Sequence, residues 1–398
     1  MKFNFKLFFK LTYHAVFHAK GTHGRLTPHR RKALFWWYIL IPPYNLISGI
    51  CLLLDNIFFP RFRKQKVEAP IFIIGNFRSG STLLQRLLAK EEDFLTAMKT
   101  WEIYLAPSLI QRKLFHLLAR FDRRFLGGFL VGLLKKREAA WLTSITMHRV
   151  ALWEVDEDEG ALLHNWTSSF LMFIFPFMDV LPPYLDFDNE MPKEEKHMTM
   201  QYYYNLVQRH VYFHGGRRYL AKNPAFSAKI IALREYFPDA KFIYLVRNPV
   251  DMLASKTSFF TYIWRYFNDP LESYPFRNML LELTRRWYLD SMNKLARLPI
   301  SEYVILKYED LMCDLDQNIR MLNHHFQIPM TPTFETQLAQ AVKDAENFVS
   351  KHNYSLIEMG YSPQQVYNQY QEIFDRFNYD LNGKALMVEV NQKYAEID

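Results

Sequence analysis

Residues 71–88 read IFIIGNFRSGSTLLQRLL, and this stretch decides the fold that we expect. The apolar run at 71–74 is typical of a short strand buried in a parallel sheet, and residues 81–90 predict a helix. Between them, Gly75 and Gly80 have the GxxxxG spacing with which a phosphate-binding loop begins. The stretch therefore predicts a strand, an anion-binding loop and a helix in direct succession.

The loop has the chemistry of an anion cradle but lacks the parts of a magnesium-dependent nucleotide site. Its backbone amides at 79–82 can point inward, the helix that follows adds a partial positive charge, and Arg78 can donate to two phosphate oxygens. Ser81 stands where a Walker loop has lysine, and the strand predicted at 241–246 is followed by Arg247 instead of a magnesium-binding aspartate. We therefore expect a nucleotide bound through its phosphates without a metal ion, and a P-loop kinase or ATPase is disfavoured.

The rest of the chain predicts a three-layer α/β domain with a central parallel sheet. Three apolar runs predict buried strands, at 71–74, 241–246 and 303–306. Helical segments separate them, and residues 197–237 are expected to continue in helical periodicity. The density of basic residues falls between 61 and 69, so we divide the chain into a basic, aromatic N-terminal segment at 1–66 and a domain at 67–398.

The net charge of +8 is unevenly distributed along the chain. Residues 1–66 hold 12 Lys+Arg and one acid, Asp55, whereas the remainder holds 37 basic and 40 acidic side chains. No nucleic-acid-binding motif accompanies the basic residues, so we expect no nucleic-acid partner. The excess charge favours the anionic headgroups of a membrane surface as the partner of this segment.

An uncharged run at 33–54, ALFWWYILIPPYNLISGICLLL, is long enough to cross a bilayer. Pro42 and Pro43 are expected to break a helix here, and both flanks are basic, so the positive-inside rule assigns no orientation. Three alternatives stay open: a segment in the membrane interface or a re-entrant hairpin, a single spanning anchor, or an aromatic arm packed on the domain. With only two cysteines, Cys51 and Cys313, we expect a cytoplasmic, membrane-associated protein, the alternative being a Golgi-type anchored one.

Two motifs together resemble the sulfotransferase family. GNFRSGSTLL at 75–84 is similar to that family's loop for the 5′-phosphosulfate of 3′-phosphoadenosine 5′-phosphosulfate (PAPS), and FIYLVRNPVDMLAS at 242–255 is similar to its 3′-phosphate motif. Further similar blocks occur in order between residues 69 and 380. The resemblance implies a P-loop-like sulfotransferase fold, PAPS as co-substrate, 3′,5′-ADP as product and no metal ion.

The resemblance also implies nucleotide-binding roles for individual residues. The phosphosulfate is expected to bind the loop residues Arg78, Ser79, Gly80, Ser81 and Thr82. Arg247 and Ser255, which stand eight positions apart, are expected to bind the 3′-phosphate, and Tyr308 is expected to contact the nucleotide.

Sulfuryl transfer needs a base that takes the proton of the acceptor hydroxyl and a cation that stabilises the leaving group. The resemblance places Glu102 as the base, where Trp101 would help to desolvate the carboxylate and raise its pKa; the alternative for Glu102 is a surface salt bridge. Lys222 and Arg78 are expected to stabilise the leaving phosphate. His148 is a second candidate base.

The acceptor is not specified by these motifs. The apolar N-terminal segment and the aromatic share of 17% favour a lipid, sterol or other hydrophobic alcohol, with a glycan or a protein tyrosine as alternatives. A membrane protein that binds the nucleotide without catalysis is a further alternative. The acidic run at 154–159 does not fit an EF-hand and is expected to be a solvated face, although similar family members carry acids near the acceptor. The oligomeric state stays open.

Overall fold

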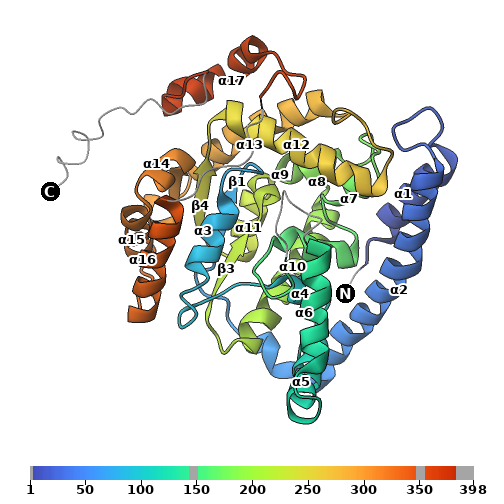
Figure 1. The fold of residues 1–398 in the computed structure, drawn as a ribbon, viewed down its shortest axis with the longest axis vertical. Coiled ribbons are helices and arrows are strands. Elements are labelled where there is room, and N and C mark those ends of the chain that lie inside the picture. Colours follow the sequence, from blue (N-terminus) through green and yellow to red (C-terminus); the bar gives the residue numbers. More distant parts are fainter. Residues whose placement is uncertain (1–2, 143–150, 347–354, 382–398) are drawn as a thin grey trace.

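The computed structural model describes residues 3–142, 151–346 and 355–381, and its centre is a sheet of parallel strands (Figure 1). The strands lie in the order β2-β3-β1-β4-β5. They are β1 Ile71–Gly75, β2 Leu95–Thr96, β3 Arg218–Lys222, β4 Lys241–Val246 and β5 Tyr303–Lys307. The predicted α/β class and the three predicted strands are confirmed.

One strand lies where the sequence predicts a helix. β3 pairs in parallel with β1, so the expectation of helix throughout 197–237 is wrong at this point. Gly215 and Gly216 both have positive φ and follow the end of α10 (Lys193–Phe213). The five residues of β3 are too few to show a hydrophobic period, and pairing with β1 overrides their local preference.

The side chains of β1 alternate between two apolar layers, one on each face of the sheet. Ile71 and Ile73 face one layer, whose helices are α3 Ser81–Leu88, α14 Tyr308–Cys313, α15 Leu315–His325 and α16 Pro332–Glu346. Phe72 and Ile74 face the other, whose helices include α10, α11 Ile230–Tyr236, α12 Pro249–Phe267, α13 Arg277–Leu295 and α17 Pro363–Phe377. The predicted three-layer arrangement is confirmed.

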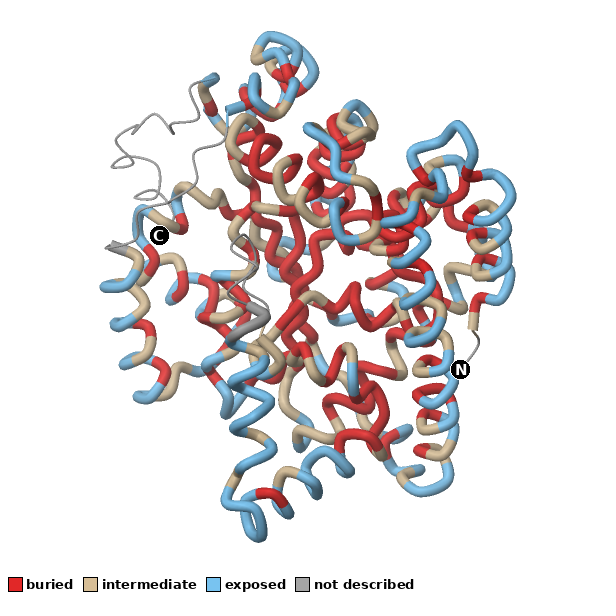
Figure 2. Tube along the Cα trace, turned by 45° about the vertical axis from the view of Figure 1, so that its right-hand side comes forward, coloured by how far each residue is buried: buried red, intermediate tan, exposed pale blue. Residues whose placement is uncertain are grey.

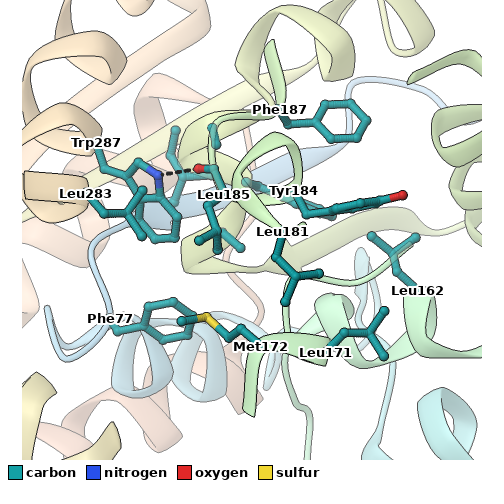
Figure 3. Close-up of a cluster of buried hydrophobic side chains, with 14 of the residues drawn as sticks. Phe77, Leu162, Leu171, Met172, Leu181, Tyr184, Leu185, Phe187, Leu283 and Trp287 are labelled. Carbon is teal, nitrogen blue, oxygen red and sulfur yellow. Dashed lines mark hydrogen bonds between the residues drawn. The ribbon is translucent and has the colours of Figure 1, made fainter. Parts of the chain in front are cut away.

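Short elements connect the longer helices and the strands. They are α4 Thr100–Tyr104, α7 Leu171–Ile174, α8 Pro182–Leu185, α9 Phe187–Glu190 and the 3₁₀ helices Pro60–Lys64, Asp158–Asn165, Pro224–Ala228 and Ile300–Glu302. Figure 3 shows the apolar cluster in which Phe77 lies near Met172 and Trp287. The indole nitrogen of Trp287 donates to the carbonyl of Leu185 over 2.9 Å, which joins α13 to α8. Because Phe77 belongs to the loop, this cluster fixes the loop on the body.

The N-terminal segment forms two helices, α1 Phe5–Phe17 and α2 Pro28–Phe58, that lie along one side of the molecule (Figure 1). α2 continues through Pro42 and Pro43, so the expected break is wrong. The prolines remove only two amide donors from 31 helical residues, and contacts with the body support the next turn, where the Asn45 side chain donates to Leu163 over 3.3 Å. α2 is long and apolar enough to cross a membrane, by length and composition only.

Buried positions concentrate in the sheet and the helices around it, whereas the outer helices are largely exposed (Figure 2). Two of these outer helices, α5 Leu109–Phe125 and α6 Phe129–Leu142, form a hairpin that begins beside the end of α2. The buried carboxylate of Asp55 accepts hydrogen bonds from the amides of Leu109 and Ile110, over 2.9 and 3.0 Å, and pairs with Arg209 over 2.9 Å. One side chain thus joins α2, α5 and α10.

We expect Asp55→Asn to lower the free energy of unfolding by about 3–5 kcal/mol, because it leaves the Arg209 guanidinium buried without its counter-charge. Urea denaturation of the full chain measures the change. Asp316→Asn is the matched control, because Asp316 pairs with Arg320 over 2.8 Å at the exposed surface, where an ion pair contributes little to stability. Equal effects of the two variants would contradict the prediction.

Candidate active site

Four parallel strands end at the same edge of the sheet, which is where α/β proteins bind ligands. β1 leads into the loop at 76–80, β3 ends at Lys222, and β4 and β5 are followed by Arg247 and Tyr308. The residues that line a cavity at this edge come mainly from these segments: Phe77, Arg78, Gly80, Ser81, Thr82, Glu157, Arg247, Phe259 and Tyr308. The fold thus brings together most of the residues that the sequence predicts for the nucleotide.

The loop after β1 depends on two glycines with positive φ. A Cβ on Gly75 would collide with the carbonyl oxygen of Leu245, so the close pairing of β1 and β4 requires glycine here. A Cβ on Gly80 would collide with the ring of Tyr308. Arg78 also has positive φ, at 71°, which turns the chain sharply between the two glycines.

Direct contacts connect the two arginines of the site. Arg78 Nε donates to the Ser255 hydroxyl over 3.0 Å, which joins the loop to α12. Arg247 Nη1 donates to the carbonyl of Arg78 over 2.8 Å, and its guanidinium lies 4.6 Å from the centre of the Tyr308 ring. The predicted phosphosulfate and 3′-phosphate residues therefore form one contiguous cluster with Tyr308.

This cluster fits an anionic ligand. Ser79 Oγ and Arg247 Nε are buried and have no hydrogen-bond partner among the residues that the structure describes. Buried donors normally have partners, so two unpaired ones in one cluster indicate a group that accepts from them. The N-terminus of α3, which begins at Ser81, adds unpaired backbone amides and the positive end of its dipole.

Glu157 lines this cavity and pairs with Lys222, which is not itself among the lining residues. Lys222 Nζ donates to Glu157 Oε1 over 2.7 Å, and the lysine side chain is fully buried whereas 13% of the glutamate side chain is exposed. Glu157 is absent from the residues singled out from the sequence. Its only sequence signal is its place in the acidic run at 154–159, and only the fold shows that this run meets the end of β3.

The expectation that the acidic run is a solvated face is wrong. Glu159 is fully buried and pairs with Lys229 over 2.8 Å. Asp158 is also fully buried and accepts hydrogen bonds from the hydroxyls of Tyr203 and Tyr219. Burial raises the pKa of Asp158 to about 7, against the two tyrosine hydrogen bonds, which lower it. The run builds the interior beneath the cavity instead of covering the surface.

Glu102 lies outside the group of residues that line the cavity. Its carboxylate is buried, 3.2 Å from Arg112 Nη1 and 2.9 Å from His214 Nε2, and it accepts from the amide of Lys99 at the start of α4. Burial favours a raised pKa, but Arg112 and then His210 and His214 hold the pKa of Glu102 well below its usual range. The expected rise in its pKa is therefore not found, and the ion pair is buried instead of lying on the surface.

Glu102, His210 and His214 place one ligand atom each within 4.8 Å of one another, as a metal site would. The guanidinium of Arg112 takes part in the same cluster, because Arg112 Nη1 also lies 3.0 Å from His210 Nδ1. This cation uses the lone pairs that a metal ion would need, so the cluster is best described as a buried ion-pair network. The second candidate base, His148, lies outside the described residues.

A buried lysine lies directly behind the loop. Lys256 is fully buried and donates to Thr284 Oγ1 over 2.8 Å and, more weakly, to Asn76 Oδ1 over 3.4 Å. The rings of Phe77 and Trp287 lie 5.6 and 5.1 Å from its ammonium nitrogen. Burial lowers the pKa of Lys256 to about 7.

The sheet, the glycine turn and the arginines at the sheet edge define an α/β protein with a P-loop-like strand–turn–helix unit. The model of the sulfotransferase family matches residues 70–332, which is more than half of the chain. The chain therefore belongs to the sulfotransferase family, and it is a sulfotransferase enzyme. The resemblance inferred from the two sequence motifs is confirmed.

Known proteins resemble the chain over most of its length. It is 27% identical over 357 residues to the omega-hydroxy-beta-dihydromenaquinone-9 sulfotransferase Stf3 of Mycobacterium bovis and of Mycobacterium tuberculosis, covering 87% of this chain and 85% of each relative. The crystal structure of sulfotransferase STF1 from M. tuberculosis matches with a TM-score of 0.67 and 17% identity, covering 93% of this chain and 92% of that one. STF9 from Mycobacterium avium matches with a TM-score of 0.64, 17% identity and coverage of 84% and 83%. The two structures support the fold.

We expect the stability of the protein relative to Lys256→Met to rise with pH between about 7 and 10.5. In this range the unfolded chain binds a proton on Lys256 that the folded chain does not, so the free energy of unfolding gains up to about 1.4 kcal/mol per pH unit. Below pH 7 both states are protonated and the difference is constant. Urea denaturation of both proteins at pH 7.5, 8.5 and 9.5 measures the difference; the prediction fails if that difference is independent of pH.

Proposed function

We propose that this sulfotransferase moves the sulfuryl group of PAPS to a hydroxyl of a lipophilic acceptor and releases 3′,5′-ADP. The observation that carries the nucleotide assignment is the pair of buried donors without partners, Ser79 Oγ and Arg247 Nε. PAPS carries several anionic groups close together. Such a molecule matches a cluster that offers these two hydrogen-bond donors, a second guanidinium and a helix N-terminus. PAPS supplies the activated sulfuryl group, and the chain supplies binding, orientation and proton transfer.

In this proposal the loop holds the phosphosulfate and the arginine after β4 holds the 3′-phosphate. Arg78 and the backbone from Ser79 through Gly80 and Ser81 to Thr82 surround the first anion. Arg247 and Ser255 hold the second, and Tyr308 stacks against Arg247 at the edge of the site. The hydrogen bond from Arg78 to Ser255 keeps the two anion sites in a fixed relation.

Glu157 is a better candidate for the base than Glu102. It lines the cavity, and 13% of its side chain is exposed. In the proposed reaction the ammonium group of its partner, Lys222, exchanges Glu157 for the leaving phosphate oxygen as negative charge develops there. Glu102 would have to give up Arg112 and His214 before it could accept a proton. We therefore assign proton abstraction to Glu157, leaving-group stabilisation to Lys222 and Arg78, and a structural role to Glu102.

Two observations favour a lipid acceptor. The named function of the Stf3 relatives is the sulfation of a menaquinone derivative, which is a lipid. The cavity beside Glu157 is bordered by the rings of Phe77 and Phe259, and the N-terminal helices expose large apolar side chains. A glycan or a protein tyrosine would make little use of these surfaces. The segment at 1–66 is proposed to lie in the membrane interface while packed on the domain at 67–398.

We expect Glu157→Gln to lower the rate of transfer by roughly 10²–10⁴, the range for loss of a general base, while binding of 3′,5′-ADP is retained. Glu102→Gln should instead lower stability and leave the rate of the folded enzyme within a few-fold. The measurement uses labelled PAPS with lipid, glycan and peptide acceptor fractions, and unfolding is followed in parallel. Glu335→Gln, on an exposed helix, is the control. Full activity in Glu157→Gln and its loss in a folded Glu102→Gln would reverse the assignment.

Arg247→Ala should weaken the binding of 3′,5′-ADP by roughly 1.5–3 kcal/mol, the range for hydrogen bonds to charged groups. Isothermal titration calorimetry measures the affinity, and Arg297→Ala, on the exposed surface, is the matched control. An unchanged affinity would remove Arg247 from the nucleotide site. Absence of binding by the unmodified protein would refute the PAPS proposal itself.

A further inference from the structure

The α5–α6 hairpin carries its large apolar side chains on the outside. Of the six large apolar residues that α5 exposes, five recur at intervals of three and four and so form one stripe: Leu114, Leu117, Leu118, Phe121 and Phe125. α6 adds four more, Phe129, Leu130, Leu133 and Leu134. Each of these nine side chains is at least 43% exposed. A contiguous apolar surface of this size on a folded protein indicates an interaction site.

Polar residues, in contrast, are the ones that hold the hairpin together. α5 buries Gln111, Arg112 and Asp122, and Leu109 is its one apolar side chain with a buried position. The two oxygens of Asp122 accept from the amides of Leu130 and Val131, over 2.9 and 3.0 Å, and so cap α6. The apolar stripe is therefore not the packed interior of the hairpin, because the polar contacts of Asp122 and the buried residues of α5 hold the hairpin without it.

Basic residues flank the stripe on one side. Lys113, Arg120 and Arg123 line a groove together with His116, Leu117 and Phe213. Between residues 113 and 137 the chain has a single acid, the buried Asp122, and no acid is among the described residues that line this groove. Apolar side chains beside a lysine and two arginines match a surface that offers hydrocarbon and phosphate together.

The hairpin continues the exposed apolar surface of the N-terminal segment. α5 begins where Asp55 of α2 caps it, and the end of α2 exposes Leu53, Ile57 and Phe58 close by in sequence. Figure 1 shows the hairpin at the lower edge of the molecule beside the C-terminal end of α2, in agreement with the contacts between these helices.

From these observations we infer that the α5–α6 hairpin is a second membrane-docking element, which inserts its apolar stripe into a bilayer rich in anionic lipid. Lys113, Arg120 and Arg123 contact the phosphates of the headgroups in this arrangement. The inference is separate from the proposed sulfuryl transfer and from membrane binding by residues 1–66. It concerns which further part of the surface touches lipid.

An environment-sensitive fluorophore at the hairpin tests the contact directly. The label is placed at Phe125→Cys in the full chain with Cys51→Ser and Cys313→Ser, and a matched label at Ile300→Cys, 72% exposed on another element, is the control. Vesicles of phosphatidylcholine with phosphatidylglycerol should shift the emission of the label at 125 to the blue, and doxyl lipids should quench it. The label at 300 should not respond. A chain that sediments with vesicles while the label at 125 stays unchanged would overturn the inference, as would absence of binding.

Charge variants test the headgroup contact. Lys113→Gln, Arg120→Gln and Arg123→Gln together should weaken binding to anionic vesicles on the order of a hundredfold, because each cation contributes a factor of about ten or less. The matched control changes Lys90, Lys193 and Arg297 to Gln, all exposed elsewhere. Equal losses in both triple variants would overturn the inference. The inference would also be overturned if the label at 125 were shifted to the blue without vesicles and the chain sedimented as a dimer, because the stripe would then bind a second copy of the chain. Binding of 3′,5′-ADP, measured on every variant, reports separately on the nucleotide site.

Discussion

The pairing of β1 with β4 on one side and β3 on the other is the constraint on which the site depends. Gly75 allows the carbonyl of Leu245 to approach β1 more closely than any side chain would permit. Because the strands are parallel, their carboxyl ends meet at one edge, and residues from distant parts of the chain converge there without long loops. Lys222 and Arg247 therefore stand at the carboxyl ends of the two strands that flank β1, and Arg247 contacts the loop directly.

The parts of the site that the sequence predicts are those in which function follows a strand end directly. Arg78 lies within a loop bounded by glycines, and Arg247 follows an apolar run of six residues, so the local pattern fixes their place at the sheet edge. Ser255 lies two turns into the next helix, and its contact with Arg78 follows from helical geometry once the strand order is known. The α/β class could also be predicted from local patterns, namely the three apolar runs that form β1, β4 and β5.

The parts that the sequence does not predict depend on contacts over long separations. Glu157 and Lys222 meet only because the segment that leads into the 3₁₀ helix at Asp158–Asn165 contacts the end of β3, and nothing in the acidic run distinguishes Glu157 from its neighbours. The burial of Asp158 and Glu159 depends on Tyr203, Tyr219 and Lys229, which follow much later in the chain. Glu102 illustrates the converse: a short motif suggests a base, but Arg112 and His214 from other helices convert it into a buried ion pair.

Charge is used differently in the interior and at the periphery of this molecule. Inside, Glu159 with Lys229 and Asp55 with Arg209 are matched pairs, because an unpaired buried charge is costly. At the periphery, basic residues of the N-terminal segment and the hairpin have few acids near them. Asp55 connects the two regimes, since the same carboxylate that neutralises Arg209 caps α5 and thereby sets the direction in which the hairpin leaves the body.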